Sequence, residues 1–285
     1  MTLRTDGWSE VCLAGARSFE MASAHTGETY RILVRIPSEP PPEGGYPALW
    51  MLDGDASFPL VYGHTNHSIA NLSPAGRDGA CQDPGVVVAV GFPGGAPFDV
   101  DARARNYTPT PDSATGDAVS PAFGGAAGFL RFLAEELRGA IAGRLPLDPG
   151  RQTLFGFSYG GLFAVHAALG QPGAFQRYWA ASPSLWFSDC LLLRRMRAAP
   201  PLVAGERLVL TVGRDEQYPP RSPGEARQLH LDRRAMVDAV TEAAVLIAAA
   251  NPAVRTELVV AADHDHFDML LHGARRAQRL AFEAP

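Results

Sequence analysis

Cysteine and charge are both scarce in this sequence. Its 285 residues include three cysteines, Cys12, Cys81 and Cys190, which are widely spaced and form no C-x-x-C pair, so the usual structural zinc and dithiol redox motifs are excluded. Charged residues make up 19% of the chain and the net charge is -5, a balance that argues against nonspecific binding to nucleic acid. We therefore expect no nucleic-acid partner and no cofactor.

Long hydrophobic runs are also missing. No stretch is long enough to span a membrane, and residues 1–18 lack the basic segment and apolar run of a signal peptide. We therefore expect no membrane association and a cytoplasmic protein, or a periplasmic one if a signal peptide has been removed. With no repeats, no linker and 46% hydrophobic residues, residues 1–285 have the composition of one large α/β domain.

Short apolar runs alternate with helical patterns along the chain. Strands are expected at 18–24, 29–36, 48–52, 86–91, 153–155, 178–182, 207–212 and 257–261, and helices at 129–141, 162–169, 235–250 and 268–282. Strands that alternate with helices form a mostly parallel central sheet with helices on both faces. Functional groups then gather where the strands end.

Residues 92–125 follow no clear period and are rich in Pro, Gly, Asp and Ala. A loop of this length in a compact domain is usually functional or mobile. We expect it to be a lid or a substrate-binding loop.

The run Gly-Phe-Ser-Tyr-Gly-Gly at 156–161 lies between an expected strand and an expected helix. Strand, G-x-S-x-G and helix in this order are typical of the nucleophile elbow of α/β hydrolases. Ser158 would sit on a strained turn, and Gly156 and Gly160 would leave room for the turning chain. The pattern therefore predicts an α/β-hydrolase fold with Ser158 as a nucleophile.

A serine hydroxyl needs a base, and the base needs an orienting acid. In this fold the chain order is serine, acid, histidine. The turn after the expected strand 207–212 contains Asp215 and Glu216. We favour Glu216, because the fold commonly places its acid three residues after a glycine such as Gly213, and Asp215 is the alternative.

The turn at 263–268 supplies two candidates for the base, His264 and His266. His266 lies immediately before the closing helix and is favoured, with His264 as the alternative. If His266 acts, Asp263 or Asp265 could replace Glu216 as its orienting acid. The spacing of these residues matches no familiar zinc motif, so we expect no metal site.

A tetrahedral intermediate needs two backbone N–H donors. One is expected from Tyr159, directly after the nucleophile. The other is expected from Gly54 or Asp55, in the turn after the strand 48–52.

Several segments, taken in order, resemble the esterase branch of the α/β hydrolases, in particular the hydrolases of catecholate siderophores such as enterobactin, salmochelin and bacillibactin. The segments are 30–32 (YRI), 52–54 (LDG), 90–93 (VGFP), 103–109 (RARNYTP), 156–161 (GFSYGG), 182–186 (SPSLW) and 212–217 (VGRDEQ). The resemblance implies ester hydrolysis by Ser158 with a late histidine as base. Some members are described as using a serine–histidine dyad, which leaves the role of Glu216 open. Asn106 departs from the family, where an aspartate is usual.

The resemblance also implies a substrate, the trilactone backbone of a catecholate siderophore, ferric or iron-free. Such a ligand is anionic and this chain is net acidic, so local positive charge is required. We expect Arg103, Arg105 and Trp186 to bind it. A second cluster consists of Arg194, Arg195 and Arg197, and we expect these arginines to lie on a solvated helix face rather than to bind substrate.

Other functions remain open at this point. The enzyme alternatives are a general carboxylesterase, an acetyl or feruloyl esterase of sugars, or an acyltransferase. From another class, the chain could be a binding protein on a hydrolase scaffold.

Overall fold

The computed structural model describes residues 13, 15–62, 82–170, 173–201, 203 and 205–284. Cys12 and Cys81 lie outside these residues, as does most of the segment considered above as a signal peptide. Within the described part of the chain, no helix combines the length and apolar character needed to cross a membrane.

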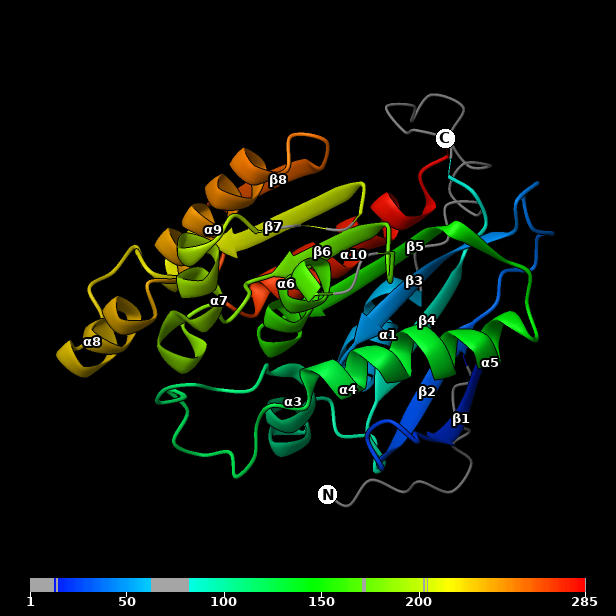
Figure 1. Cartoon of the computed structure of the whole chain (residues 1–285), viewed down its shortest axis with the longest axis horizontal. Helices are drawn as coiled ribbons and strands as arrows, with labels where there is room; N and C mark the ends of the chain where they lie inside the picture. The colour runs from blue at the N-terminus through cyan, green and yellow to red at the C-terminus, as the bar shows by residue number, and fades with distance from the viewer. Residues whose placement is uncertain are drawn as a thin grey trace, which may run out of the picture.

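One eight-stranded sheet runs through the molecule (Figure 1). Its strands, in chain order, are β1 (Ala16–Ala22), β2 (Thr29–Arg35), β3 (Tyr46–Leu52), β4 (Val86–Gly91), β5 (Leu147–Phe157), β6 (Arg177–Ala181), β7 (Arg207–Gly213) and β8 (Arg255–Ala261). The order across the sheet is β1-β2-β4-β3-β5-β6-β7-β8. Strands β3 to β8 are parallel to one another, while β2 is antiparallel to both β1 and β4. The predicted, mostly parallel sheet is confirmed.

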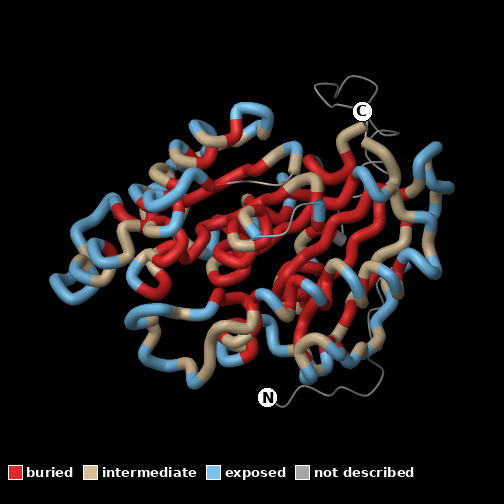
Figure 2. Tube along the Cα trace, viewed as in Figure 1, coloured by how far each residue is buried: buried red, intermediate tan, exposed pale blue. Residues whose placement is uncertain are grey.

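Helices cover both faces of this sheet. They are α1 (Gly54–Tyr62), α3 (Val100–Tyr107), α4 (Ala126–Arg131), η1 (Phe132–Leu137), α5 (Arg138–Ala142), α6 (Tyr159–Gly170), α7 (Phe187–Ala198), η2 (Arg214–Glu216), α8 (Glu225–Arg234), α9 (Met236–Ala250) and α10 (Asp268–Phe282). Helices α1 and α10 pack on one face, and α3 to α7 with α9 pack on the other. Figure 2 shows the resulting pattern, with buried strands in the middle and exposed chain at the periphery.

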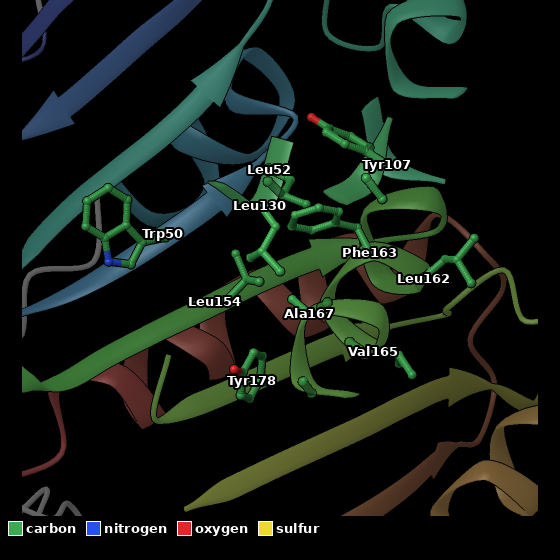
Figure 3. Packing of buried hydrophobic residues seen from close by; sticks show 14 of the residues in the cluster. Trp50, Leu52, Tyr107, Leu130, Leu154, Leu162, Phe163, Val165, Ala167 and Tyr178 are labelled. Atoms are coloured by element: carbon green, nitrogen blue, oxygen red, sulfur yellow. The ribbon is translucent and has the colours of Figure 1, made fainter. Parts of the chain in front are cut away.

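Burial along the strands follows their place in the sheet. Strands β3 and β4 are buried at every residue, whereas β2 buries only alternate residues. Central parallel strands are covered on both faces, and strands near an edge on one. In Figure 3, Phe163 and Ala167 of α6 lie against Leu154 of β5, with Tyr107 and Leu130 beside them. This packing fixes α6 on the strand that carries Ser158.

The sequence analysis did not predict α1, α3 or α8, and for α7 it proposed only that Arg194, Arg195 and Arg197 lie on a helix face. Helix α1 contains Pro59 and α8 has one buried residue in ten, so neither displays a clear apolar period. In α7, three residues after Phe187 lie in the left-handed region, so its first turn is irregular. The segment 92–125 was expected to be irregular throughout. It contains α3, whose first turn is capped by Asp99 through a 3.0 Å bond from the backbone N–H of Ala102.

His166 of α6 borders a pocket of about 280 Å³ between α6 and α7, lined mainly by apolar side chains such as Leu192 and Met196. Burial, assisted by the nearby charge of Arg195, lowers the pKa of His166 to about 4. The unfolded chain therefore binds a proton here more readily than the folded protein does, and acidification from about pH 6.5 to about pH 4 favours unfolding.

We expect His166→Gln to reduce the loss of thermal stability between pH 7 and pH 5, because this group then no longer binds a proton on unfolding. Thermal unfolding followed by circular dichroism at several pH values gives Tm, and the slope of Tm against pH measures this loss. A second neutral replacement, His166→Asn, is the matched comparison and is expected to reduce the loss to the same extent. Parallel slopes for wild type and His166→Gln would contradict the assignment.

Candidate active site

Ser158 lies between the last residue of β5 and the first residue of α6. Its φ of 58° is in the left-handed region, which costs a non-glycine residue about 1–3 kcal/mol. A Cβ added to Gly156 would come within 1.9 Å of the carbonyl oxygen of Gly160, and one added to Gly161 within 2.7 Å of that of Ala181. Only glycine fits at Gly156 and Gly161, whereas a Cβ on Gly160 would be 3.4 Å from its nearest neighbour, an ordinary contact, so the expectation that Gly160 leaves room for the turn is wrong.

His266 is the histidine that reaches the nucleophile. Its Nε2 lies 3.1 Å from Ser158 Oγ, and its ring packs against Phe157 with centroids 4.7 Å apart. The residue stands in the turn between β8 and α10, and its side chain is 30% exposed. A base in this position is both hydrogen-bonded to the serine and reachable by water.

Glu216 orients this histidine. Its Oε2 lies 2.5 Å from His266 Nδ1, while its Oε1 accepts bonds from the Ser182 hydroxyl at 2.5 Å and the Gly213 backbone N–H at 2.8 Å. The side chain is only 2% exposed. A carboxylate at Nδ1 keeps a proton on that nitrogen, so the Nε2 lone pair faces Ser158.

The alternative residues bind elsewhere. His264 Nδ1 lies 2.6 Å from the carbonyl oxygen of Ala262, and the backbone N–H of Asp215 donates to the carbonyl of His264 at 3.2 Å. The carboxylate of Asp265 caps the start of α10, accepting from the N–H groups of Phe267 and Asp268. The structure thus brings together Ser158, His266 and Glu216. Glu216, and neither Asp263 nor Asp265, binds His266 Nδ1, while the bond of Asp215 to this turn is made by its backbone.

No group of three histidine, cysteine, aspartate or glutamate side chains is placed to hold a metal ion in the part of the chain that the structure describes.

The expected oxyanion donors start two helices. Tyr159 is the first residue of α6, and Gly54 and Asp55 are the first two of α1. Backbone N–H groups in a first helical turn have no partner within the helix and favour negative charge. A Cβ added to Gly54 would lie 2.9 Å from the backbone nitrogen of Gly91, so the first residue of α1 is in close contact with the end of β4.

The long loop reaches this site at two points. The Tyr159 hydroxyl donates to Asp117 Oδ2 at 2.8 Å, and a Cβ on Gly116 would lie 3.2 Å from the Trp186 ring. The loop is fastened to the start of α7, where Ser188 Oγ accepts two backbone N–H groups of the loop at 3.1 Å each. It is therefore part of the site, and its motion as a lid stays a prediction.

Arg103 offers no free positive charge to a substrate, contrary to expectation. Its side chain is 10% exposed, and its guanidinium binds both carboxylate oxygens of Asp53, at 2.7 and 3.2 Å. It also donates to the carbonyl oxygen of Phe157 at 3.3 Å. Asp53 precedes Gly54 and Phe157 precedes Ser158, so Arg103 ties the two oxyanion-donor turns together.

Arg105 likewise has a partner, since it forms an ion pair with Glu28 on the far side of α3 and lines a separate pocket with Thr29 and Phe92. Of the second cluster, Arg194 pairs with Asp112 and Arg197 with Glu242. Arg105, Arg194 and Arg197 therefore cannot bind an anion without breaking an existing pair, whereas Arg195 lines the pocket between α6 and α7.

Trp186 does lie beside the nucleophile, with its ring 5.8 Å from that of Tyr159. Its other neighbour is the guanidinium carbon of Arg234, 4.3 Å from the ring centroid. Sequence reasoning missed Arg234, along with Ser182 and with Ser184, whose Oγ is 3.4 Å from that of Ser158. The two serines lie in the 182–186 segment that carries part of the resemblance, whereas nothing in the sequence links Arg234 to the site.

We expect Arg103→Ala to destabilise the protein, because it leaves the carboxylate of Asp53 buried without its partner, at a cost of about 3–5 kcal/mol in the free energy of unfolding. It should also lower kcat/KM to a similar extent for neutral and anionic esters, because both use the same donors. Denaturant unfolding and steady-state kinetics on the two kinds of ester measure these effects.

The matched control is Arg105→Ala, which removes a half-exposed ion pair on the same helix and should cost under about 1 kcal/mol. Arg103→Lys keeps the charge but not the two-pronged geometry and should be intermediate. If Arg103→Ala raised KM only for the anionic ester and left stability unchanged, Arg103 would be a substrate-binding residue.

Comparison with known proteins identifies the family. The family model described as "Putative esterase" matches residues 23–250. The ferri-bacillibactin esterase BesA of Bacillus subtilis is 34% identical over 201 residues, which cover 68% of each protein. The siderophore enterobactin esterase of Emericella nidulans is 32% identical over 241 residues, 77% of this chain and 76% of that protein.

A solved structure agrees with these matches. The siderophore hydrolase EstB from Aspergillus nidulans superimposes with a TM-score of 0.80 at 28% identity, over 98% of each chain. The chain thus belongs to the Putative esterase family and is a carboxylic ester hydrolase with the α/β-hydrolase fold.

Proposed function

We propose that this enzyme hydrolyses the ester bonds of a siderophore, with a catecholate trilactone as the favoured substrate, through an acyl-enzyme on Ser158. The observation that carries the proposal is the continuous hydrogen-bonded chain from Glu216 through His266 to Ser158. The substrate class is supported by the two relatives named above, a ferri-bacillibactin esterase and an enterobactin esterase.

Acylation begins with attack of Ser158 Oγ on an ester carbonyl carbon, while His266 Nε2 accepts the hydroxyl proton. The imidazolium that forms is stabilised by Glu216 at Nδ1. The carbonyl oxygen becomes an oxyanion, which the N–H groups of Tyr159 and of Gly54 or Asp55 stabilise. Collapse breaks the bond to the alcohol oxygen, which leaves with the proton from His266.

Deacylation repeats these steps with water. His266 removes a proton from the water molecule as its oxygen attacks the acyl carbonyl carbon. The bond to Ser158 Oγ then breaks, and the serine recovers its proton from His266, releasing a carboxylic acid. The partial exposure of His266 supports this step, because its Nε2 must be accessible to water once the alcohol has left.

Glu216 is proposed to take part in the reaction by orienting His266 and stabilising its protonated form. Its carboxylate is buried and bound by three donors, so it has no freedom to move away from the histidine. A triad rather than a serine–histidine dyad is therefore proposed for this enzyme.

Hydrolysis of a substrate panel tests the substrate class. The panel contains ferric and iron-free tri-catecholate lactones, aryl acetates, and acetyl and feruloyl sugars, with products followed by chromatography. Cleavage of the lactones with kcat/KM well above that of the other esters is expected. Preference for aryl acetates would indicate a general carboxylesterase, preference for sugar esters a sugar-ester hydrolase, and transfer to an added alcohol in place of water an acyltransferase.

We expect Ser158→Ala and His266→Ala each to lower kcat by about 10⁶-fold, and the double variant to be little worse than either single one, because the residues act as a unit. The matched control, His264→Gln, should stay close to wild type. Stopped assays on a neutral aryl ester measure the rates, and labelling of wild type, but not of Ser158→Ala, by a fluorophosphonate probe reports the nucleophile directly.

The reverse pattern, with an inactive His264 variant and an active His266 variant, would exchange the two histidines. A wild-type protein that the probe does not label would instead favour a binding protein on a hydrolase scaffold.

We expect Glu216→Gln to lower kcat by about 10⁴-fold, less than loss of the serine or the base, because it removes the charge that stabilises the imidazolium and allows the wrong tautomer. Asp215→Asn is the matched control and should have little effect. Rates from the same ester assay decide the point. A near-wild-type kcat for Glu216→Gln would favour a serine–histidine dyad. A severe loss of kcat in Asp215→Asn would identify Asp215 as the orienting acid.

A further inference from the structure

Arg234, the last residue of α8, is half-buried, and its guanidinium makes no ion pair or hydrogen bond with any residue the structure describes. The arginines discussed above differ from it. Arg103, Arg105 and Arg194 each bind a carboxylate of this chain. A partly buried charge without a bonded counter-ion is costly, so an anion bound at this guanidinium would stabilise it.

The contact with Trp186 explains how the charge is held. The guanidinium carbon lies 4.3 Å from the centroid of the ring, within the range of a cation–π interaction. This contact uses the flat face of the guanidinium and leaves its N–H groups, which lie in the plane, available to an acceptor. Trp186 thus fixes Arg234 without consuming its hydrogen bonds.

The same stack leads to the reacting serine. Trp186 packs on Tyr159, which adjoins Ser158 and is proposed to supply an oxyanion donor. Burial lowers the pKa of Arg234 and the charge of Arg227 lowers it further, while the nearby Tyr159, Asp117 and Glu216 oppose that shift. No ion pair joins Arg234 to Asp117, whose carboxylate accepts bonds from the Tyr159 hydroxyl and from the loop.

The rest of α8 adds positive charge in the same region. Burial lowers the pKa of His230, and the nearby charges of Arg234, Arg227 and Arg233 lower it further. The helix therefore presents several cations close together, although the chain as a whole carries a charge of -5. In Figure 1, α8 projects beside α7 beyond the ends of the strands, on the side of the molecule where the long loop also lies.

We infer that Arg234, held by Trp186, is a specificity-determining residue that binds the anionic aromatic ring of the substrate through its free N–H groups. A catecholate or carboxylate offers two oxygens in the geometry that a guanidinium matches. This inference rests on the proposed function for the identity of the ring, but the anion preference itself is independent of it. It assigns to Arg234 the role that sequence analysis gave to Arg103.

A pair of simple esters isolates the charge. 4-Acetoxybenzoate and 4-acetoxybenzamide have nearly the same shape, and only the first is anionic. For wild type we expect a higher kcat/KM on the anionic ester, and for Arg234→Ala a fall of about tenfold in the ratio of the two kcat/KM values, as loss of one charge-assisted hydrogen bond implies. The change should lie in KM rather than kcat, and added salt should reproduce part of it.

Arg233→Ala is the matched control, since it removes the same charge from the exposed neighbouring residue and should leave the ratio near that of wild type. Arg234→Lys should restore the ratio only in part. In a Ser158→Ala background, quenching of tryptophan fluorescence by a ferric tri-catecholate measures binding directly, and Arg234→Ala should raise Kd about tenfold.

The outcomes separate the two proposals. A wild-type enzyme that ignores siderophores but keeps the Arg234-dependent ratio would refute the siderophore substrate and support the anion-binding role. If Arg234→Ala lowered kcat/KM equally on both esters, Arg234 would be a purely structural residue. If Arg233→Ala changed the ratio of the two kcat/KM values as much as Arg234→Ala does, the preference would come from the overall positive charge of α8. Either of these last results would overturn the inference.

Discussion

The buried carboxylate of Glu216 joins the ends of three neighbouring strands. One of its oxygens accepts from Ser182 after β6 and from Gly213 at the end of β7, and the other binds His266 after β8. A carboxylate this deeply buried is tolerated only while its donors stay in place. The geometry at Ser158 therefore depends on how the second half of the sheet packs, and His266 alone does not determine it.

Periodicity and turn chemistry predict a large part of this fold. Strand β4 and helix α10 begin and end at the expected residues, because each has a regular buried face. The chain order of serine, acid and histidine at strand ends also predicts which residue types meet. The choice between His264 and His266 depends instead on a contact between turns, where a Cβ on Gly213 would come within 2.3 Å of the carbonyl oxygen of His264. No local pattern encodes that contact.

Electrostatic partners are harder still to predict, because they are distant in the sequence. Arg103 and Asp53 are 50 residues apart, and a single sequence gives no indication that they meet. The sequence contains no lysine, so all 25 of its basic side chains are arginines. The planar guanidinium suits both environments found near the nucleophile, a two-pronged bond to a buried carboxylate and a stack on an indole ring, better than an ammonium group does.

Tyr159 belongs to two parts of the molecule at once. Its backbone starts the helix behind the nucleophile, and its hydroxyl is held by Asp117 in the long loop. Substrate range evolves most readily in loops, yet here a change in the loop also acts on the residue next to the nucleophile. Selection for new substrates in this enzyme is thereby coupled to selection for rate, so gains in breadth that come from rebuilding this loop are expected to require compensating changes around Tyr159.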